Sequence, residues 1–93
     1  MLIAAIELHL SIPEAHSLKE KRMVILSIMD RIRAKFGAAV AEVGEQEVWQ
    51  RTVIGVALVG NEEAFLRQVA DKVIHFTESH FEGEVCEIHL EIL

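Results

Sequence analysis

The stretch that decides the fold is His16-Ser17-Leu18-Lys19-Glu20-Lys21-Arg22, because it begins the first helix of the chain. Ser17 with Glu20 three residues later is the pattern of a capping box, in which the hydroxyl accepts from the amide of the third helical residue and the carboxylate reaches back to the cap amide. Gly37 is a typical helix stop. We therefore predict a helix from Ser17 to about Phe36. Its apolar stripe consists of Leu18, Ile25, Ile28, Met29, Ile32 and Phe36.

A strand precedes this helix and ends at Pro13, which cannot continue a sheet ladder. Apolar residues from Leu2 to Ile12 alternate with others, which is typical of a strand with one buried face. The predicted inward residues are Leu2, Ala4, Ile6, Leu8, Leu10 and Ile12, and the outward ones are Ala5, Glu7, His9 and Ser11.

Two more strands are predicted after the helix, at residues 38–43 and 52–59, with a turn at 44–47. Residues 52–59 are apolar on both faces and rich in β-branched side chains, which favours a central strand. Asn61 is predicted to cap a second helix that ends near His80. A last strand follows Gly83, with Cys86, Ile88, Leu90 and Ile92 facing inward.

The elements follow one another in the order βαββαβ within a single domain, residues 1–93. A chain of this length can bury one modest core and is too short for two. Right-handed crossovers place both helices on one face of a four-stranded antiparallel sheet, with the first and third strands in the centre. We therefore expect the α+β, ferredoxin-like plait.

The composition favours a cytoplasmic globular protein. A hydrophobic fraction of 52% excludes general disorder. The N-terminal apolar run lacks a basic segment and breaks at Glu7, so it is not a signal peptide, and no apolar run approaches the roughly 20 residues of a membrane helix. The single cysteine, Cys86, is predicted to be a buried and inert thiol.

Positive charge is concentrated in one segment of an acidic chain. The net charge of −6 disfavours nucleic-acid binding. Residues 19–35, however, hold six of the nine Lys and Arg residues and two of the 15 acidic ones. In the expected topology this helix N-terminus meets residues 49–51 and His80 at one end of the molecule, where a partner with negative charge could bind. The candidate binding residues of this basic pole are Ser17, Lys19, Lys21, Arg22, Trp49, Gln50 and Arg51.

Several of these features also have a purely structural explanation. Long cationic side chains commonly cover the edges of a core, which is our interpretation of Arg31, Arg33 and Lys35. Trp49 is typical of a large residue at a core edge, and beside Arg51 it is also a candidate binding platform. Both interpretations of the basic pole stay open at this point.

The outer face of the sheet is the second candidate surface. An apolar sheet face left bare in so small a protein usually marks a partner interface, so we expect a homodimer. Histidines and carboxylates on the first and last strands are suitable metal ligands, but two adjacent strands alone form a flat array, and no metal site is predicted. The expected interface consists of Val53, Gly55, Ala57 and Val59, and the polar residues beside it are Glu7, His9, Glu87, His89 and Glu91.

No enzyme signature is present: the chain has no Gly-rich phosphate loop, no Cys-x-x-Cys and no nucleophile elbow. The central strands also lack the exposed aromatic residues of sheet-face RNA recognition. We therefore expect a binding protein without a cofactor. Three interpretations remain: a module that binds an anionic partner, a structural homodimer, and small-molecule binding at the sheet face.

Four motifs make the chain resemble the YlxP-like family of small bacterial proteins of unknown function. They are His16 to Arg22 with Val24, Arg33-x-Lys35-Phe36, Val40-Ala-Glu-Val43, and Trp49-Gln50-Arg51 followed by Ile54-Gly55. The resemblance covers nearly the whole chain and implies the ferredoxin-like fold and a cytosolic location. Members are often encoded beside translation-initiation and ribosome-maturation genes, which suggests RNA, the ribosome or a ribosome-associated protein as the partner. No catalytic residue is established for the family.

Overall fold

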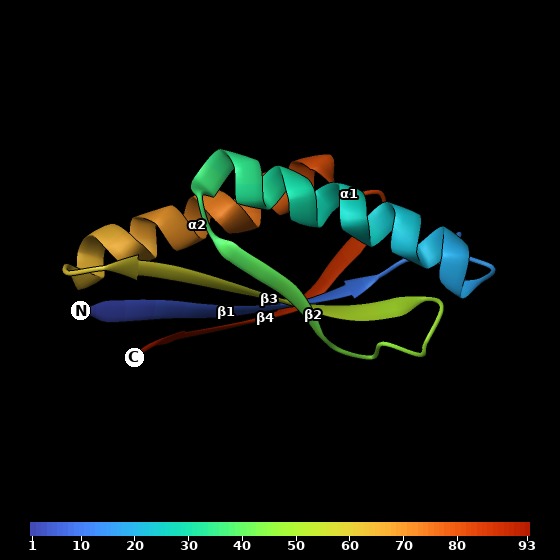
Figure 1. The fold of residues 1–93 in the computed structure, drawn as a ribbon, viewed down its shortest axis with the longest axis horizontal. Helices are drawn as coiled ribbons and strands as arrows, with labels where there is room; N and C mark the ends of the chain where they lie inside the picture. Colours follow the sequence, from blue (N-terminus) through green and yellow to red (C-terminus); the bar gives the residue numbers. More distant parts are fainter.

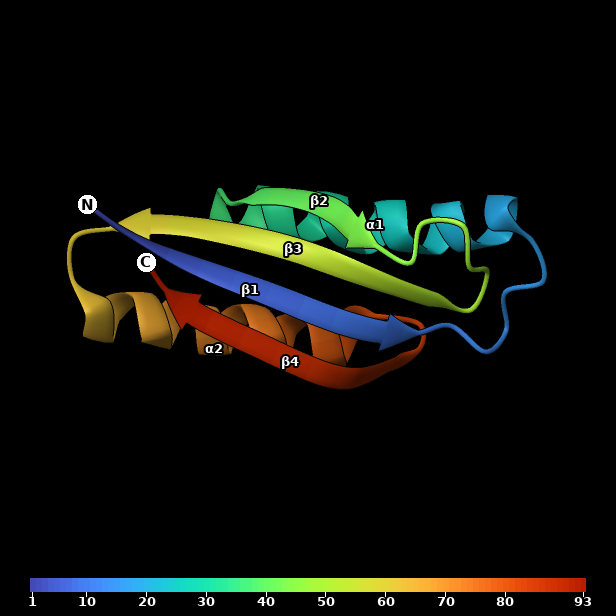
Figure 2. The same cartoon turned by 90° about the horizontal axis from the view of Figure 1, so that it is seen from below.

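The computed structural model describes all 93 residues, Met1–Leu93. Two helices lie on one face of a four-stranded antiparallel sheet, and the other face is bare (Figures 1 and 2). The strand order β2-β3-β1-β4 places β1 and β3 in the centre, which confirms the predicted ferredoxin-like fold. The elements are β1 (Leu2–Ser11), α1 (Leu18–Phe36), β2 (Ala39–Gly44), β3 (Arg51–Gly60), α2 (Glu63–His80) and β4 (Glu84–Ile92).

The core lies between the sheet and the two helices. β1 and β3 pair without a break, from Leu2 opposite Gly60 to Ser11 opposite Arg51, so the inward and outward residues of β1 alternate as predicted. Of the inward residues predicted for β4, Leu90 and Ile92 pack against the core and Ile88 is exposed. The most deeply buried apolar residues include Ala4, Ile6, Leu8, Ile12, Ile25, Ile32, Ile54, Leu66 and Val73.

Local signals set the ends of α1. Ser17 Oγ accepts a hydrogen bond from the Glu20 amide at 3.1 Å, as predicted, whereas the Glu20 carboxylate accepts from the His16 amide at 2.6 Å rather than from the cap residue. Gly37 ends the helix with a φ of 61°, a conformation that favours glycine.

The second helix begins one residue later than predicted. Its N-cap is Glu62, which forms no side-chain capping bond. Asn61, the predicted cap, lies instead in the bend where the chain reverses direction after β3. It ends at His80, as predicted. Neither helix has a stretch that is long and apolar enough to cross a membrane.

Cys86 is the extra residue of a bulge in β4. His9 pairs with Glu87, while the next residue, Leu10, pairs with Val85. Val85 therefore packs against the core and Cys86 is exposed. The predictions that Cys86 faces inward and is a buried thiol are wrong, because a strict alternation does not continue through a bulge.

Candidate functional site

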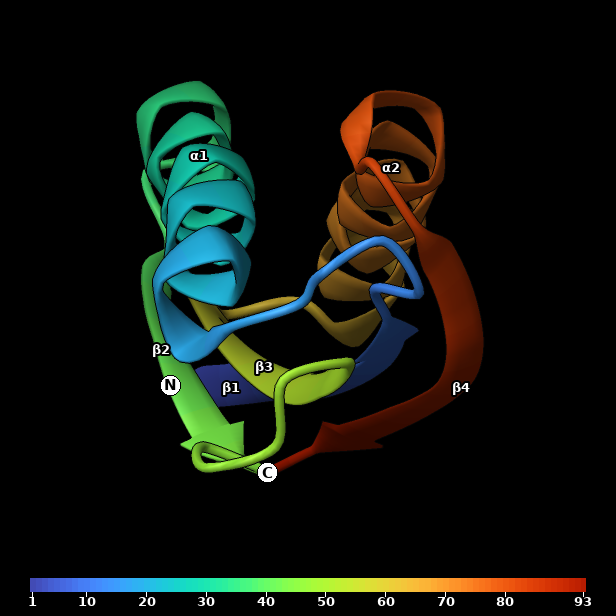
Figure 3. The ribbon, with the colours of Figure 1, turned by 90° about the vertical axis from the view of Figure 1, so that its right-hand side faces the viewer.

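The basic pole forms where the N-terminus of α1 meets the connection between β2 and β3, at one end of the long axis (Figures 1 and 3). The amide of Ile12 donates to the carbonyl of Gln50 at 2.9 Å. The side-chain amide of Gln50 donates to the carbonyls of Pro13 and Ala15, each at 3.2 Å. These bonds hold the two segments together, so Gln50 serves the fold of the pole.

The N-terminus of α1 is already occupied by groups of the chain itself. Ser17 Oγ satisfies one free amide, and the Glu20 carboxylate places a negative charge at the positive end of the helix. Ser17 therefore acts as a helix cap, and Glu20 supplies a negative charge of the chain itself at this helix end.

Lys21 was predicted to contribute to the exposed basic pole, and this prediction is wrong because the residue is buried. Its side chain is buried, and Nζ donates to the carbonyls of Glu45 at 2.6 Å and Gln46 at 3.3 Å. Nζ also forms an ion pair with Glu42 Oε2 at 3.0 Å, an oxygen that accepts from Thr52 Oγ1 at 2.6 Å. Lys21 therefore connects α1 to β2 and to the turn after it.

The cations left exposed at the basic pole are Lys19, Arg22 and Arg51. None of them forms an ion pair within the chain, in contrast to the cations that the fold uses elsewhere. Trp49, in the connection that leads to Arg51, is 50% exposed. These four side chains are the part of the predicted surface that is available to a partner.

Arg51 belongs to the outer face of the sheet rather than to the helix surface. It lies opposite Ser11 in the register, and both residues line a hollow of about 90 Å³ together with His9 and Cys86. The exposed cations of the basic pole are thus divided between the first turns of α1 and the adjoining end of the sheet.

His80 does not belong to the basic pole, although it was predicted to lie there. It stacks on Phe76, with ring centroids 4.3 Å apart, and lines a hollow between the two helices with Arg31 and Met23. α2 is too short to bring its last residue to the N-terminus of α1 (Figure 1).

Two of the three lower cations of α1 have the structural role predicted for them. Arg33 donates to Asp30 Oδ1 at 2.8 Å and to the Val40 carbonyl at 2.7 Å. Lys35 lies over the ring of Phe76, with Nζ 5.5 Å from its centroid. These contacts connect α1 to β2 and to α2.

The side of the outer sheet face formed by β2 and β3, whose strands are seen in Figure 2, carries mainly apolar residues. A shallow hollow of about 400 Å³ is present there, and Val59 is 65% exposed. Gly55 and Ala57 of the predicted interface contribute to this hollow. Its other small outward-facing residues are Ala5, Ala39, Ala41 and Val43.

Val53 is not available to an interface, and its assignment to one was wrong. It is 8% exposed, although it points to the outer face. A bulge at Val43 shifts the pairing so that Gly44 lies opposite Val53, and the turn that begins there covers the Val53 side chain.

A polar cluster occupies the β1 and β4 side of the same face. His89 Nε2 lies 2.9 Å from Glu87 Oε2, and the rings of His9 and His89 meet edge to face, with centroids 5.1 Å apart. The hydrogen bond from His89, with its charge, lowers the pKa of Glu87, and the hydrogen bond to Glu87 raises the pKa of His89. The cluster is a compact arrangement of two imidazoles and a carboxylate.

Comparison with known proteins supports the resemblance found in the sequence. The model of a family described as "Protein of unknown function (DUF503)" matches residues 3–90. The chain belongs to the DUF503 family. Over 83 residues it is 36% identical to "Uncharacterized protein YlxP" of Bacillus subtilis (strain 168), which covers 89% of this chain and 90% of the Bacillus protein.

The DUF503 match spans both candidate surfaces, because residues 3–90 include the basic pole and the outer sheet face. Neither description assigns an activity. Sequence reasoning missed Glu42 as the partner of Lys21. The signal was present in this DUF503 chain: Glu42 stands two residues after the inward Val40 of a strand, where an apolar residue is expected.

Proposed function

We propose that the chain is a non-enzymatic binding module of the cytoplasm, which holds the phosphate backbone of RNA, free or within the ribosome, at the basic pole. The observation that carries this proposal is the half-exposed Trp49, two residues before Arg51, at the same end of the molecule as exposed cations that form no ion pair in the chain. Aromatic side chains stack on nucleic-acid bases, and Lys and Arg neutralise phosphates.

The internal contacts of the pole support the proposal because they make the surface rigid. Gln50 and Lys21 fasten the connection between β2 and β3 to α1, so the Trp49 backbone is held in place before a partner arrives. A preorganised site loses less conformational entropy on binding.

Replacing Lys19, Arg22 and Arg51 by Gln should weaken RNA binding without loss of stability, because the three side chains are exposed and unpaired. Each lost phosphate contact should flatten the slope of log affinity against log salt by roughly 0.7, or about 2 for three contacts. Trp49 is the only tryptophan, so its fluorescence can follow the titration with a single-stranded RNA oligonucleotide.

The matched control replaces Arg31, Arg67 and Lys72 by Gln, which removes the same charge from other surfaces. An equal loss of affinity in both variants would mean that net charge alone, and not the basic pole, governs binding. Unchanged binding in the pole variant, or binding to an acidic protein in place of RNA, would contradict the proposal.

A second candidate function is homodimerisation through the apolar region of the outer sheet face, favoured by the exposed Val43 and Val59 beside the hollow at Ala57. Ala57→Arg should convert a dimer of the wild type into a folded monomer, because a charge would be buried in the interface without a partner. Light scattering at micromolar concentration measures both masses.

The control for this prediction is Ala34→Arg, which adds the same side chain to the exposed surface of α1. It should leave the dimer intact. A wild-type mass of one chain would rule out this second function.

A further inference from the structure

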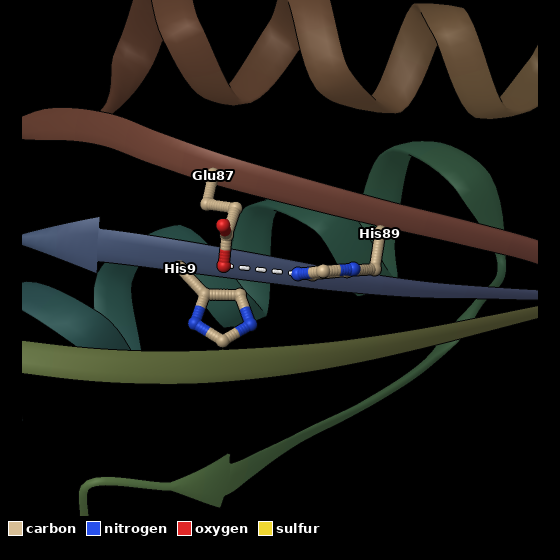
Figure 4. Close-up of side chains that lie close together, drawn as sticks. All are labelled: His9, Glu87 and His89. Atoms are coloured by element: carbon tan, nitrogen blue, oxygen red, sulfur yellow. Dashed lines mark hydrogen bonds and ion pairs between the residues drawn. The ribbon is translucent and has the colours of Figure 1, made fainter.

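The polar cluster on the outer sheet face has the composition and spacing of a metal site. His9, from β1, and Glu87 and His89, from β4, each place a ligand atom within 4.8 Å of the other two. Figure 4 shows the three side chains pointing toward one another, with the Glu87 carboxylate next to both imidazoles. The flat array expected for two adjacent strands is therefore not what the structure contains.

The register explains why the ligands converge. His9 lies directly opposite Glu87, and His89 is the diagonal neighbour on the same face. The bulge at Cys86 immediately precedes Glu87, and such bulges increase the local twist and redirect side chains.

One nitrogen of the cluster has no hydrogen-bond partner. Nε2 of His9 is buried as an atom, accepts from and donates to nothing, and lies 3.5 Å from Glu7 Oε1, beyond a good hydrogen bond. An unpaired buried nitrogen costs free energy unless a ligand satisfies it. The unpaired nitrogen of His9 is therefore a second observation, separate from the short distances between the three ligand atoms, that points to a ligand at this cluster.

We propose that His9, Glu87 and His89 bind a divalent transition-metal ion of the zinc type. Two imidazoles and one carboxylate are ligands that zinc accepts, whereas calcium and magnesium prefer oxygen atoms alone. In a tetrahedral zinc site with bonds of about 2.0–2.1 Å, the ligand atoms lie about 3.4 Å apart. Small side-chain rotations achieve this spacing from 4.8 Å or less. The fourth position faces solvent, where water completes the coordination.

Untagged protein, stripped with EDTA and titrated with zinc sulfate by calorimetry, should bind one zinc ion per chain. Cobalt(II) at the same site should give the strong visible absorption of a four-coordinate ion. This test does not involve the basic pole, so its outcome is independent of RNA binding.

The variants Glu87→Gln and His89→Asn should lower zinc affinity by about 10- to 100-fold or more, since loss of a supporting group alone commonly costs that factor. Both residues are exposed, so the fold should be kept, which circular dichroism verifies. The controls are Glu91→Gln on the same strand, His75→Asn on α2 and Cys86→Ser in the bulge. The proposal is overturned if equimolar zinc does not bind, or if the ligand variants retain the zinc affinity of the wild type.

Discussion

Glu42→Gln is expected to lower the free energy of unfolding by about 3 kcal/mol, the lower end of the range for breaking a buried ion pair. The substitution keeps the size of the side chain but removes the charge 3.0 Å from Lys21 Nζ, whose side chain is 1% exposed. The Lys21 ammonium still donates to the carbonyls of Glu45 and Gln46 in this variant. The loss of stability should therefore not reach the upper end of the range for a broken buried ion pair. The melting temperature should fall by about 12–24 °C. Thermal unfolding followed by circular dichroism measures it.

Two further variants isolate the cause of this effect. Asp30→Asn breaks the exposed pair with Arg33 and should cost no more than about 1 kcal/mol. Combining Lys21→Met with Glu42→Gln removes the buried charge as well as its partner, so the double variant should be more stable than Glu42→Gln alone. If Glu42→Gln costs no more than Asp30→Asn, the buried pair does not hold the pole together.

The burial of Lys21 was indicated in the sequence, but only by position. Lys21 stands three residues after Leu18 and four before Ile25, so it continues the apolar stripe of α1. Glu42 likewise occupies an inward position of β2, as Thr52 does on β3. Opposite charges at two inward positions predict a buried ion pair. The assignment of Lys21 to the exposed basic pole did not take this position into account.

The order and type of all six elements could be predicted, because their signals are local. Ser17 and Gly37 act through hydrogen bonds and backbone conformation within one helical turn, and the alternation in β1 requires only one buried face. These features depend little on the rest of the chain.

The two bulges could not be predicted, and each accounts for one wrong prediction. An extra residue at Cys86 turned that thiol outward, and one at Val43 brought the next turn over Val53. Both depend on the pairing with another strand, which single-strand periodicity does not contain. The convergence of His9 with His89 has the same origin.

Gly83→Ala is the second substitution with a large expected effect, a loss of about 3 kcal/mol, at the upper end of the usual cost of overpacking. A Cβ at this position would collide with the backbone carbonyl oxygen of Ser11 and lie 2.6 Å from Cε2 of Phe81. Phe81 is 8% exposed and belongs to the core, so its ring has little space to withdraw. Urea unfolding followed by Trp49 fluorescence measures the loss.

The control is Gly37→Ala, where a Cβ meets no atom within 4 Å and only the φ of 61° opposes the substitution. Gly37→Ala should lower the free energy of unfolding by about 1–2 kcal/mol, the cost of placing a residue with a Cβ in the left-handed conformation. Adding Phe81→Leu to Gly83→Ala should not restore stability, since the Ser11 oxygen is part of the ladder between β1 and β4 and cannot move away. A smaller loss for Gly83→Ala than for Gly37→Ala would contradict this prediction. It would mean that the segment joining α2 to β4 can shift to make room for the Cβ, and that the close approach of Gly83 to Ser11 does not hold this segment rigidly.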